Sequence, residues 1–233
     1  MYGQASSTPY DLRFTVWGIP IRVHPVFWLT SAFLAWNPDR LDFVVVRVLC
    51  IFVAILVHEL GHAVVTKSLG WQPEIVLYFF GGFATTTRHS TWKNIAVTAA
   101  GPSAGFMLFF TLLFAQLFGG RAGWFENDIV RDALGFSLFI NLVWNAMNLV
   151  PVLPLDGGHI SRDFLSWLSP RNGMKASLVI SVAASGGVVL WAVRCIQNNQ
   201  GLLGLDPKFL AIMFGVLCFH SIQQLQNMKR GYW

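Results

Sequence analysis

Val53-Ala54-Ile55-Leu56-Val57-His58-Glu59-Leu60-Gly61-His62 continues an apolar run that begins at Phe43 and carries one earlier charge, Arg47. A run of this length and composition predicts a helix that crosses a lipid bilayer. An ionised side chain at the centre of such a helix costs about 2.5–3.5 kcal/mol on insertion scales. Ionisable groups kept at that cost are candidates for function, so this stretch indicates both the fold class and the site.

The spacing within this stretch points to a metal. His58 and His62 are four residues apart, so both imidazoles project from one face of a helix. Glu59 stands beside them, where a carboxylate can reach water on a bound metal. This is the HExxH pattern, in which two histidines hold zinc and the glutamate is the general base.

The composition excludes an ordinary soluble enzyme. Of the 233 residues, 55% are hydrophobic and only 12% are charged, against about 25% charged in soluble domains. With 20 Phe and 10 Trp, the chain is expected to be a multi-pass protein of the cell membrane. The net charge of +5 fits a bias of basic residues in loops, and we expect no nucleic-acid partner. The three cysteines (Cys50, Cys195 and Cys218) are expected to be small buried hydrophobes.

We therefore predict an all-α integral membrane protein of about six transmembrane helices, with a small β-hairpin at a membrane-embedded active-site cleft. The expected spans are 25–36, 43–69, 94–118, 129–150, 175–195 and 208–226. Residues 1–13 are expected to form a polar tail, and 14–233 a single domain. Alternating apolar residues predict extended chain over Phe14–His24.

The predicted hairpin covers residues 74–87. Ile75–Phe80 favours a strand, Gly81-Gly82 is a turn candidate, and Phe83–Thr87 returns as a second strand. Unpaired backbone at membrane depth is tolerated where it lines a cavity. The hairpin serves either as packing or as an edge strand, near Gly81 and Gly82, that binds unwound substrate.

Two small-residue and polar patterns mark the middle of the chain. Gly101 and Gly105 form GxxxG, which favours close packing of helices. Asn141, Asn145 and Asn148 form one polar stripe on an apolar helix. We interpret Asn141 and Asn145 first as polar contacts between helices.

A third zinc ligand is needed, because catalytic zinc usually has three protein ligands and one water. Asp156, in Pro154-Leu155-Asp156-Gly157-Gly158, is the best candidate, since it lies at the expected depth of the HELGH motif. Asn148 is our candidate donor to the oxyanion formed during peptide hydrolysis. His159 is a weaker alternative ligand, and His24 is expected to cap or orient the first span.

The basic residues predict an orientation. With six spans, the side that holds both termini carries ten of the 16 Lys and Arg residues and the other side six. The positive-inside rule then places both termini in the cytoplasm.

Taken in order, HELGH, the Gly81-Gly82 region, Ala100-Gly101-Pro102 and Asn148–Gly158 make this chain resemble the site-2 protease family of intramembrane zinc metalloproteases. The resemblance covers residues 14–160 by motif. It implies one zinc ion held by His58, His62 and Asp156, Glu59 as catalytic base, and Asn148 near the scissile bond. It further implies that the substrate is a single-span, membrane-anchored regulatory protein, cleaved in or near its transmembrane segment within the lipid bilayer.

Two other classes remain open at this point. A membrane zinc transporter would need ligands staged across the full membrane depth, whereas these candidates cluster at one level. A catalytically silent scaffold with a structural metal would have no use for Glu59. The sequence gives no oligomeric state and no substrate identity.

Overall fold

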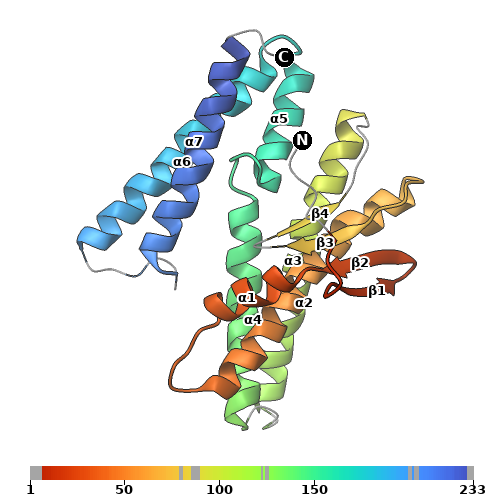
Figure 1. Ribbon diagram of the computed structural model, residues 1–233, viewed down its shortest axis with the longest axis vertical. Coiled ribbons are helices and arrows are strands. Elements are labelled where there is room, and N and C mark those ends of the chain that lie inside the picture. The colour runs from red at the N-terminus through yellow and green to blue at the C-terminus, as the bar shows by residue number, and fades with distance from the viewer. Residues whose placement is uncertain are drawn as a thin grey trace. The chain divides into compact units, whose positions relative to one another are not determined.

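The computed structural model describes residues 7–78, 81–84, 90–121, 123, 126–198, 201 and 205–229. The chain divides into two compact units, residues 1–88 with 100–145, and residues 89–99 with 146–233. Figure 1 labels the elements. The helices are α1 (Pro25–Leu34), α2 (Leu41–Ser68), α3 (Thr91–Arg121), α4 (Asp128–Asn148), α5 (Asp156–Leu168), α6 (Gly173–Gln197) and α7 (Pro207–Lys229). The strands are β1 (Leu12–Val16), β2 (Ile19–Val23), β3 (Ile75–Tyr78) and β4 (Gly81–Ala84).

The protein is a mostly helical, multi-pass membrane protein. Among the described residues, four helices are long and apolar enough to cross a bilayer: Leu41–Ser68, Thr91–Gly120, Gly173–Gln197 and Pro207–Met228. The expected spans 25–36 and 129–150 are helices as well. However, α1 has only 10 residues, and α4 carries Asp128, Arg131 and Asp132 in its first turns, which lower its hydropathy.

The long helices keep large apolar side chains exposed. Val53 on α2, Phe114 on α3 and Leu190 on α6 are 47%, 59% and 73% exposed. Only 17–28% of each spanning window is buried inside the protein. Such apolar surface would be costly in water, and a bilayer covers it without that cost.

A four-stranded sheet of order β1-β2-β3-β4 belongs to the first unit. β1 and β2 form an antiparallel hairpin, β3 lies parallel to β2, and β4 is antiparallel to β3. The predicted extended stretch Phe14–His24 is thus confirmed, although β1 begins at Leu12, within the expected tail. Trp17 and Gly18 have φ of 50° and 71°, as a two-residue primed turn requires.

The Gly81-Gly82 turn prediction is wrong. Gly81 pairs with Tyr78, and Gly82 pairs with Leu77, so both glycines lie in β4. Residues 79 and 80, and the predicted strand residues 85–87, lie outside the described residues. The glycine pair misled because glycine is typical of turns but also occurs where backbones approach closely in a strand.

The core of the first unit forms where the sheet meets α1 and α2. Ile19, Ile21 and Val23 alternate inward from β2 and are at most 2% exposed. They belong to one cluster with Phe27 of α1 and Ile55 of α2. This burial fixes the sheet against the helix that carries HELGH.

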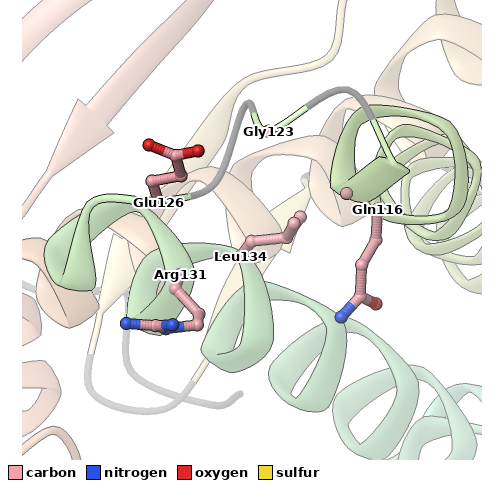
Figure 2. Close-up of a pocket in the computed structure, with 6 residues that line it drawn as sticks. Gln116, Gly123, Glu126, Arg131 and Leu134 are labelled. Carbon is pink, nitrogen blue, oxygen red and sulfur yellow. The ribbon is translucent and has the colours of Figure 1, made fainter.

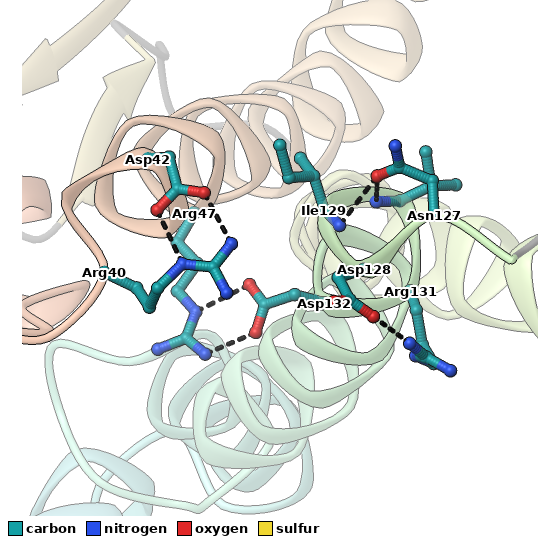
Figure 3. A network of polar contacts seen from close by, with 9 residues as sticks. Arg40, Asp42, Arg47, Asn127, Asp128, Ile129, Arg131 and Asp132 are labelled. Atoms are coloured by element: carbon teal, nitrogen blue, oxygen red, sulfur yellow. Dashed lines mark hydrogen bonds and ion pairs between the residues drawn. The ribbon is translucent and has the colours of Figure 1, made fainter.

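Two polar contacts fix the helices of this unit. The predicted cap at His24 is confirmed, since its Nδ1 accepts a hydrogen bond from the Val26 N–H at 3.2 Å, at the start of α1. Further along, Arg47 of α2 donates two hydrogen bonds to Asp132 of α4, at 2.9 and 2.5 Å (Figure 3). The pair neutralises the single charge of the apolar run before HELGH.

In the second unit, α6 and α7 lie side by side (Figure 1), and α5 packs against α6. The helix α5 was not predicted. Its 13 residues are too short for a span, and Gly157-Gly158 is unfavourable for a helix start.

Candidate metal centre

The two HELGH histidines lie one turn apart on α2 and converge. Their Nε2 atoms are 3.1 Å apart, and their rings meet edge to face with centroids 4.8 Å apart. His58 is 2% exposed, Glu59 6% and His62 8%. Three ionisable groups are therefore buried within a 28-residue apolar helix, as the sequence predicted.

The spacing of the two imidazoles fits zinc. Two ligands at Zn–N distances of about 2.0–2.1 Å and a tetrahedral angle are separated by about 3.3 Å. The Nε2 atoms at 3.1 Å are close to that value. Two nitrogen lone pairs at this distance repel each other unless a cation or a proton lies between them. Imidazole nitrogen is also a preferred zinc donor.

Three glycines allow α2, α3 and α4 to approach at this point. A Cβ at Gly61 would lie 2.4 Å from the Ala100 carbonyl oxygen, so α2 and α3 pack backbone to backbone here. A Cβ at Gly101 would lie 2.2 Å from His62 Nε2, and one at Gly105 would lie 2.1 Å from Asn145 Nδ2. The predicted GxxxG therefore serves packing, but it also makes room for two polar side chains.

Asn145 directly contacts one of the candidate metal ligands, His58. Its Oδ1 is 2.9 Å from His58 Nδ1, and the residue is 1% exposed. Its neighbour one turn earlier, Asn141, is equally buried but donates to the carbonyl oxygen of Ser137 on its own helix. This hydrogen bond joins α2 and α4, so it agrees with the predicted role of Asn145 as a polar contact between helices. Its partner, however, is the candidate ligand His58. Sequence reasoning missed that partner.

The third candidate ligand belongs to the second unit. Among the described residues, the candidate metal-ligating group is His58, His62 and Asp156, without His159. Asp156 is the first residue of α5. A carboxylate at a helix N-terminus is stabilised by the unpaired N–H groups and the helix dipole.

The glycines after Asp156 let α5 begin against the preceding turn. A Cβ at Gly157 would lie 2.2 Å from the Leu149 carbonyl oxygen, and one at Gly158 would lie 2.4 Å from the Val152 carbonyl carbon. Backbone in contact with backbone cannot adjust as a side chain can. Gly157 and Gly158 therefore fix where α5, and with it Asp156, starts relative to the proline-rich turn, residues 149–155.

A hydrogen-bonded chain holds this turn to the α6–α7 pair. The Leu153 N–H donates to Ser181 Oγ at 3.0 Å, and Ser181 Oγ is 2.8 Å from Ser221 Oγ. Ser221 Oγ donates in turn to the Leu217 carbonyl oxygen at 2.9 Å. Since the Ser221 proton is used there, Ser181 donates to Ser221, and the direction of every bond is fixed.

The remaining predicted residues are placed as follows. Asn148 is the last residue of α4 and leads into the turn that ends at Asp156. Gly81 and Gly82 lie in β4, at one end of the strand order. A pocket of about 380 Å³ at the far end of α3 is lined by Gln116, Gly120, Gly123, Glu126, Arg131 and Leu134. It contains none of the predicted site residues (Figure 2).

Comparison with known proteins bears on these motifs. Residues 123–192, which include Asn148 and Asp156, match the model of peptidase family M50. The chain belongs to peptidase family M50. The matched residues do not include the HELGH motif. Its two histidines and its glutamate are therefore an observation separate from the M50 match.

Curated relatives agree with the M50 assignment. A zinc metalloprotease of Methanocaldococcus jannaschii is 32% identical over 162 residues, covering 67% of this chain and 46% of the relative. The stage IV sporulation protein FB of Bacillus subtilis is 30% identical over 149 residues, covering 61% of this chain and 46% of the relative. The chain spans about half the length of the curated relatives it matches.

The fold agrees as well. The solved site-2 protease from M. jannaschii superposes with a TM-score of 0.60 at 23% identity, covering 93% of this chain and 95% of that one. This M50 protein therefore has the site-2 protease fold. It carries the His-His-Asp candidate set of a family of zinc metalloproteases.

Proposed function

We propose that this protein is a zinc-dependent intramembrane endopeptidase that cleaves membrane-anchored regulatory proteins within or near a transmembrane segment. The observation that carries the proposal is the convergence of His58 and His62, with Nε2 atoms 3.1 Å apart, inside the apolar helix α2. Glu59 is buried beside them, in the position of a general base. Membership of a zinc metalloprotease family supports the same reaction class.

In this proposal, His58, His62 and Asp156 hold one zinc ion. Bound zinc supplies Lewis acidity, which activates water and polarises a carbonyl oxygen. Glu59 accepts the proton of the attacking water and delivers it to the departing amine nitrogen. Burial of Glu59 excludes bulk water, so the proton remains with the reacting groups.

Asn148 is proposed as the donor that stabilises the oxyanion. It ends α4, where the helix gives way to the turn that leads to Asp156. An amide N–H aimed at a developing negative charge is worth about 2.7–4 kcal/mol when removed. Asn148→Ala should therefore lower kcat more than it raises KM.

The substrate is proposed to bind as an extended strand along β4. A helix shields its own carbonyl groups, so cleavage inside a transmembrane segment requires local unwinding. β4, with Gly81 and Gly82, is at one end of the strand order and has a free edge among the described strands. A strand edge offers main-chain donors and acceptors to an extended peptide. N-methylation of alternate substrate amides should raise KM if this mode is used.

We also propose that both termini lie in the cytoplasm, on the basis of the ten-to-six distribution of basic residues. Accessibility of single cysteines introduced at positions 8 and 127, in a background without the three native cysteines, tests this orientation. Labelling of position 8 from the outside of intact cells would contradict it.

The proposed activity is tested with purified protein in liposomes and a panel of single-span substrates, with zinc measured on the same samples. Wild type and Glu59→Gln should both contain zinc, and only wild type should cleave. Zinc in both with cleavage by neither would favour a silent scaffold, and zinc flux across the liposomes would favour a transporter.

A further inference from the structure

We propose that Asn145 is a positioning residue that holds the His58 imidazole in the tautomer and orientation that zinc binding needs, and that Gly105 is glycine in order to admit it. The inference rests on the proposed zinc site. It assigns a specific role to a side chain that the sequence alone marks only as polar within an apolar helix.

The orientation of the Asn145 amide follows from its neighbours. Its Nδ2 is 2.5 Å from the carbonyl oxygen of Asn141, which only accepts hydrogen bonds. The nitrogen must therefore face Asn141, and Oδ1 faces His58 Nδ1 at 2.9 Å. The two hydrogen bonds leave no freedom to exchange the oxygen and the nitrogen.

This orientation determines where the His58 proton lies. A carbonyl oxygen such as Asn145 Oδ1 only accepts, so His58 Nδ1 must carry the hydrogen. A neutral imidazole with its proton on Nδ1 has a lone pair on Nε2, the atom that faces His62. Asn145 thus selects the ring state in which His58 can bind a metal through Nε2. It also fixes the ring plane.

Gly105 completes the arrangement from α3. A Cβ at this position would lie 2.1 Å from Asn145 Nδ2, 2.2 Å from Oδ1 and 2.4 Å from Cγ. No rotation of the amide relieves contacts with all three atoms, so any larger residue must displace Asn145. At 1% exposure, Asn145 is enclosed by protein and cannot simply turn out to solvent.

The chain offers a matched control for a role in helix packing alone. Asn141 lies one turn away on the same helix, is also 1% exposed, and uses its Nδ2 only on the Ser137 carbonyl oxygen of its own helix. If asparagine served only to pack α4, replacement of either residue by leucine should have the same effect. If Asn145 positions His58, only Asn145→Leu should weaken zinc binding.

The test measures zinc dissociation constants of the full chain in detergent, by competition with a chromophoric chelator. Asn145→Leu should bind zinc about 10- to 100-fold more weakly than wild type, the range found when partners of metal-ligating histidines are removed. Asn141→Leu should stay within threefold of wild type. Asn145→Asp keeps an acceptor for His58 Nδ1 and should recover most of the affinity.

A second measurement reads the tautomer directly. In zinc-free protein with 15N-labelled histidine, wild type and Asn141→Leu should show the His58 proton on Nδ1, and Asn145→Leu should lose that preference. The His58 signals are assigned by their absence from His58→Asn.

A third comparison addresses the glycine and guards against a leucine variant that does not fold. Gly105→Ala should weaken zinc binding as Asn145→Leu does. In an Asn145→Ala background, where the amide is gone, the same change should have little further effect.

Equal zinc affinity in Asn145→Leu and wild type, or equal losses in Asn145→Leu and Asn141→Leu, would overturn the proposal. A different result would contradict the proposed protease function alone. In that case wild type binds zinc but cleaves no membrane substrate, while the zinc affinities of Asn145→Leu and Asn141→Leu still differ as expected. A wild type that binds no zinc would overturn both.

Discussion

Gly101 on α3 faces the His62 imidazole so closely that a Cβ at this position would lie 2.2 Å from Nε2 and 2.3 Å from Cε1. The hydrogen atom that glycine has in place of a side chain therefore defines one wall of the candidate metal centre. The GxxxG pattern therefore does more than allow the helices to pack. Adding a single methyl group at Gly101 tests this.

Gly101→Ala is expected to weaken zinc binding by at least tenfold, because the added methyl group must push the His62 ring away from its position beside His58. Gly120→Ala on the same helix is the control, since a Cβ there meets nothing within 4 Å. That control should keep zinc affinity and gain about 0.5–1 kcal/mol of stability. Chelator competition measures the zinc affinities of both variants. Equal affinities in Gly101→Ala and wild type would show that this close approach is not needed for zinc binding.

Glu59→Gln should retain zinc and lose about 10²–10⁴-fold in kcat/KM, because glutamine is nearly isosteric but cannot accept the proton of the attacking water. His58→Ala should lose both zinc and cleavage. Wild type should lose cleavage once a chelator has removed its zinc. The measurement is zinc content and cleavage rate on the same preparations. Cleavage by Glu59→Gln at the wild-type rate would refute the assigned base.

Gly157→Ala should reduce both stability and zinc affinity. The new methyl group would lie 2.2 Å from the Leu149 carbonyl oxygen, so the start of α5 and Asp156 must shift. Gly186→Ala in α6, where a Cβ meets nothing within 4 Å, should be neutral or slightly stabilising. Thermal unfolding and zinc titration in detergent distinguish the two. Similar behaviour of both variants would exclude a special role for the glycine at the start of α5.

Ser181→Ala should cost about 1–3 kcal/mol, because it leaves the buried Leu153 N–H without its acceptor. Ser177→Ala is the matched control. Ser177 is also buried in α6, but its hydroxyl group donates only to the Met174 carbonyl oxygen of the same helix. Unfolding midpoints and hydrogen exchange at the Leu153 amide report the difference. An unchanged exchange rate at Leu153 in Ser181→Ala would mean that the chain of serines does not hold the turn.

Asp11 should make the β1–β2 hairpin sensitive to acid. Hydrogen bonds from the hydroxyl group and N–H of Thr8, with a further one from Arg22, hold the pKa of Asp11 well below its ordinary value, against an opposing effect of burial. A carboxyl group with a lowered folded-state pKa contributes stability above its unfolded pKa. That contribution is lost as the pH falls through the folded value.

The prediction for Asp11 is therefore strong amide protection of the hairpin at neutral pH, and loss of protection only under strongly acidic conditions. Asp11→Asn removes the titrating group and should flatten this dependence. Hydrogen exchange of β1 and β2 measured against pH provides the readout. Parallel pH profiles for the two proteins would show that Asp11 does not contribute.

Much of the site was predictable from residues close together in sequence. The HELGH spacing fixes the geometry of His58 and His62, because residues four apart in a helix share a face whatever surrounds them. The alternation over Ile19, Ile21 and Val23 gave the buried face of β2 for the same local reason. The cap at His24 followed from its place directly before Pro25, the first residue of α1.

Predictions failed where local preference and tertiary pairing disagree. Gly81 and Gly82 favour a turn by propensity, but pairing with Tyr78 and Leu77 places them in a strand. The start of α5 was missed because glycine is unfavourable in helices, whereas contact with the Leu149 and Val152 backbone requires it there. In both cases the decisive partner lies on another element.

The sequence by itself determined the membrane class, the zinc motif and the identity of the candidate ligands, since hydropathy and helical spacing are properties of short segments. Only the tertiary structure showed that Asn145 faces His58 and that Gly101 and Gly105 leave room for His62 and Asn145. These contacts join residues 39 to 87 positions apart, and no local pattern encodes which side chains will meet. The candidate zinc ligands can thus be identified from the sequence, while the packing of α2, α3 and α4 decides how the His58 imidazole is oriented.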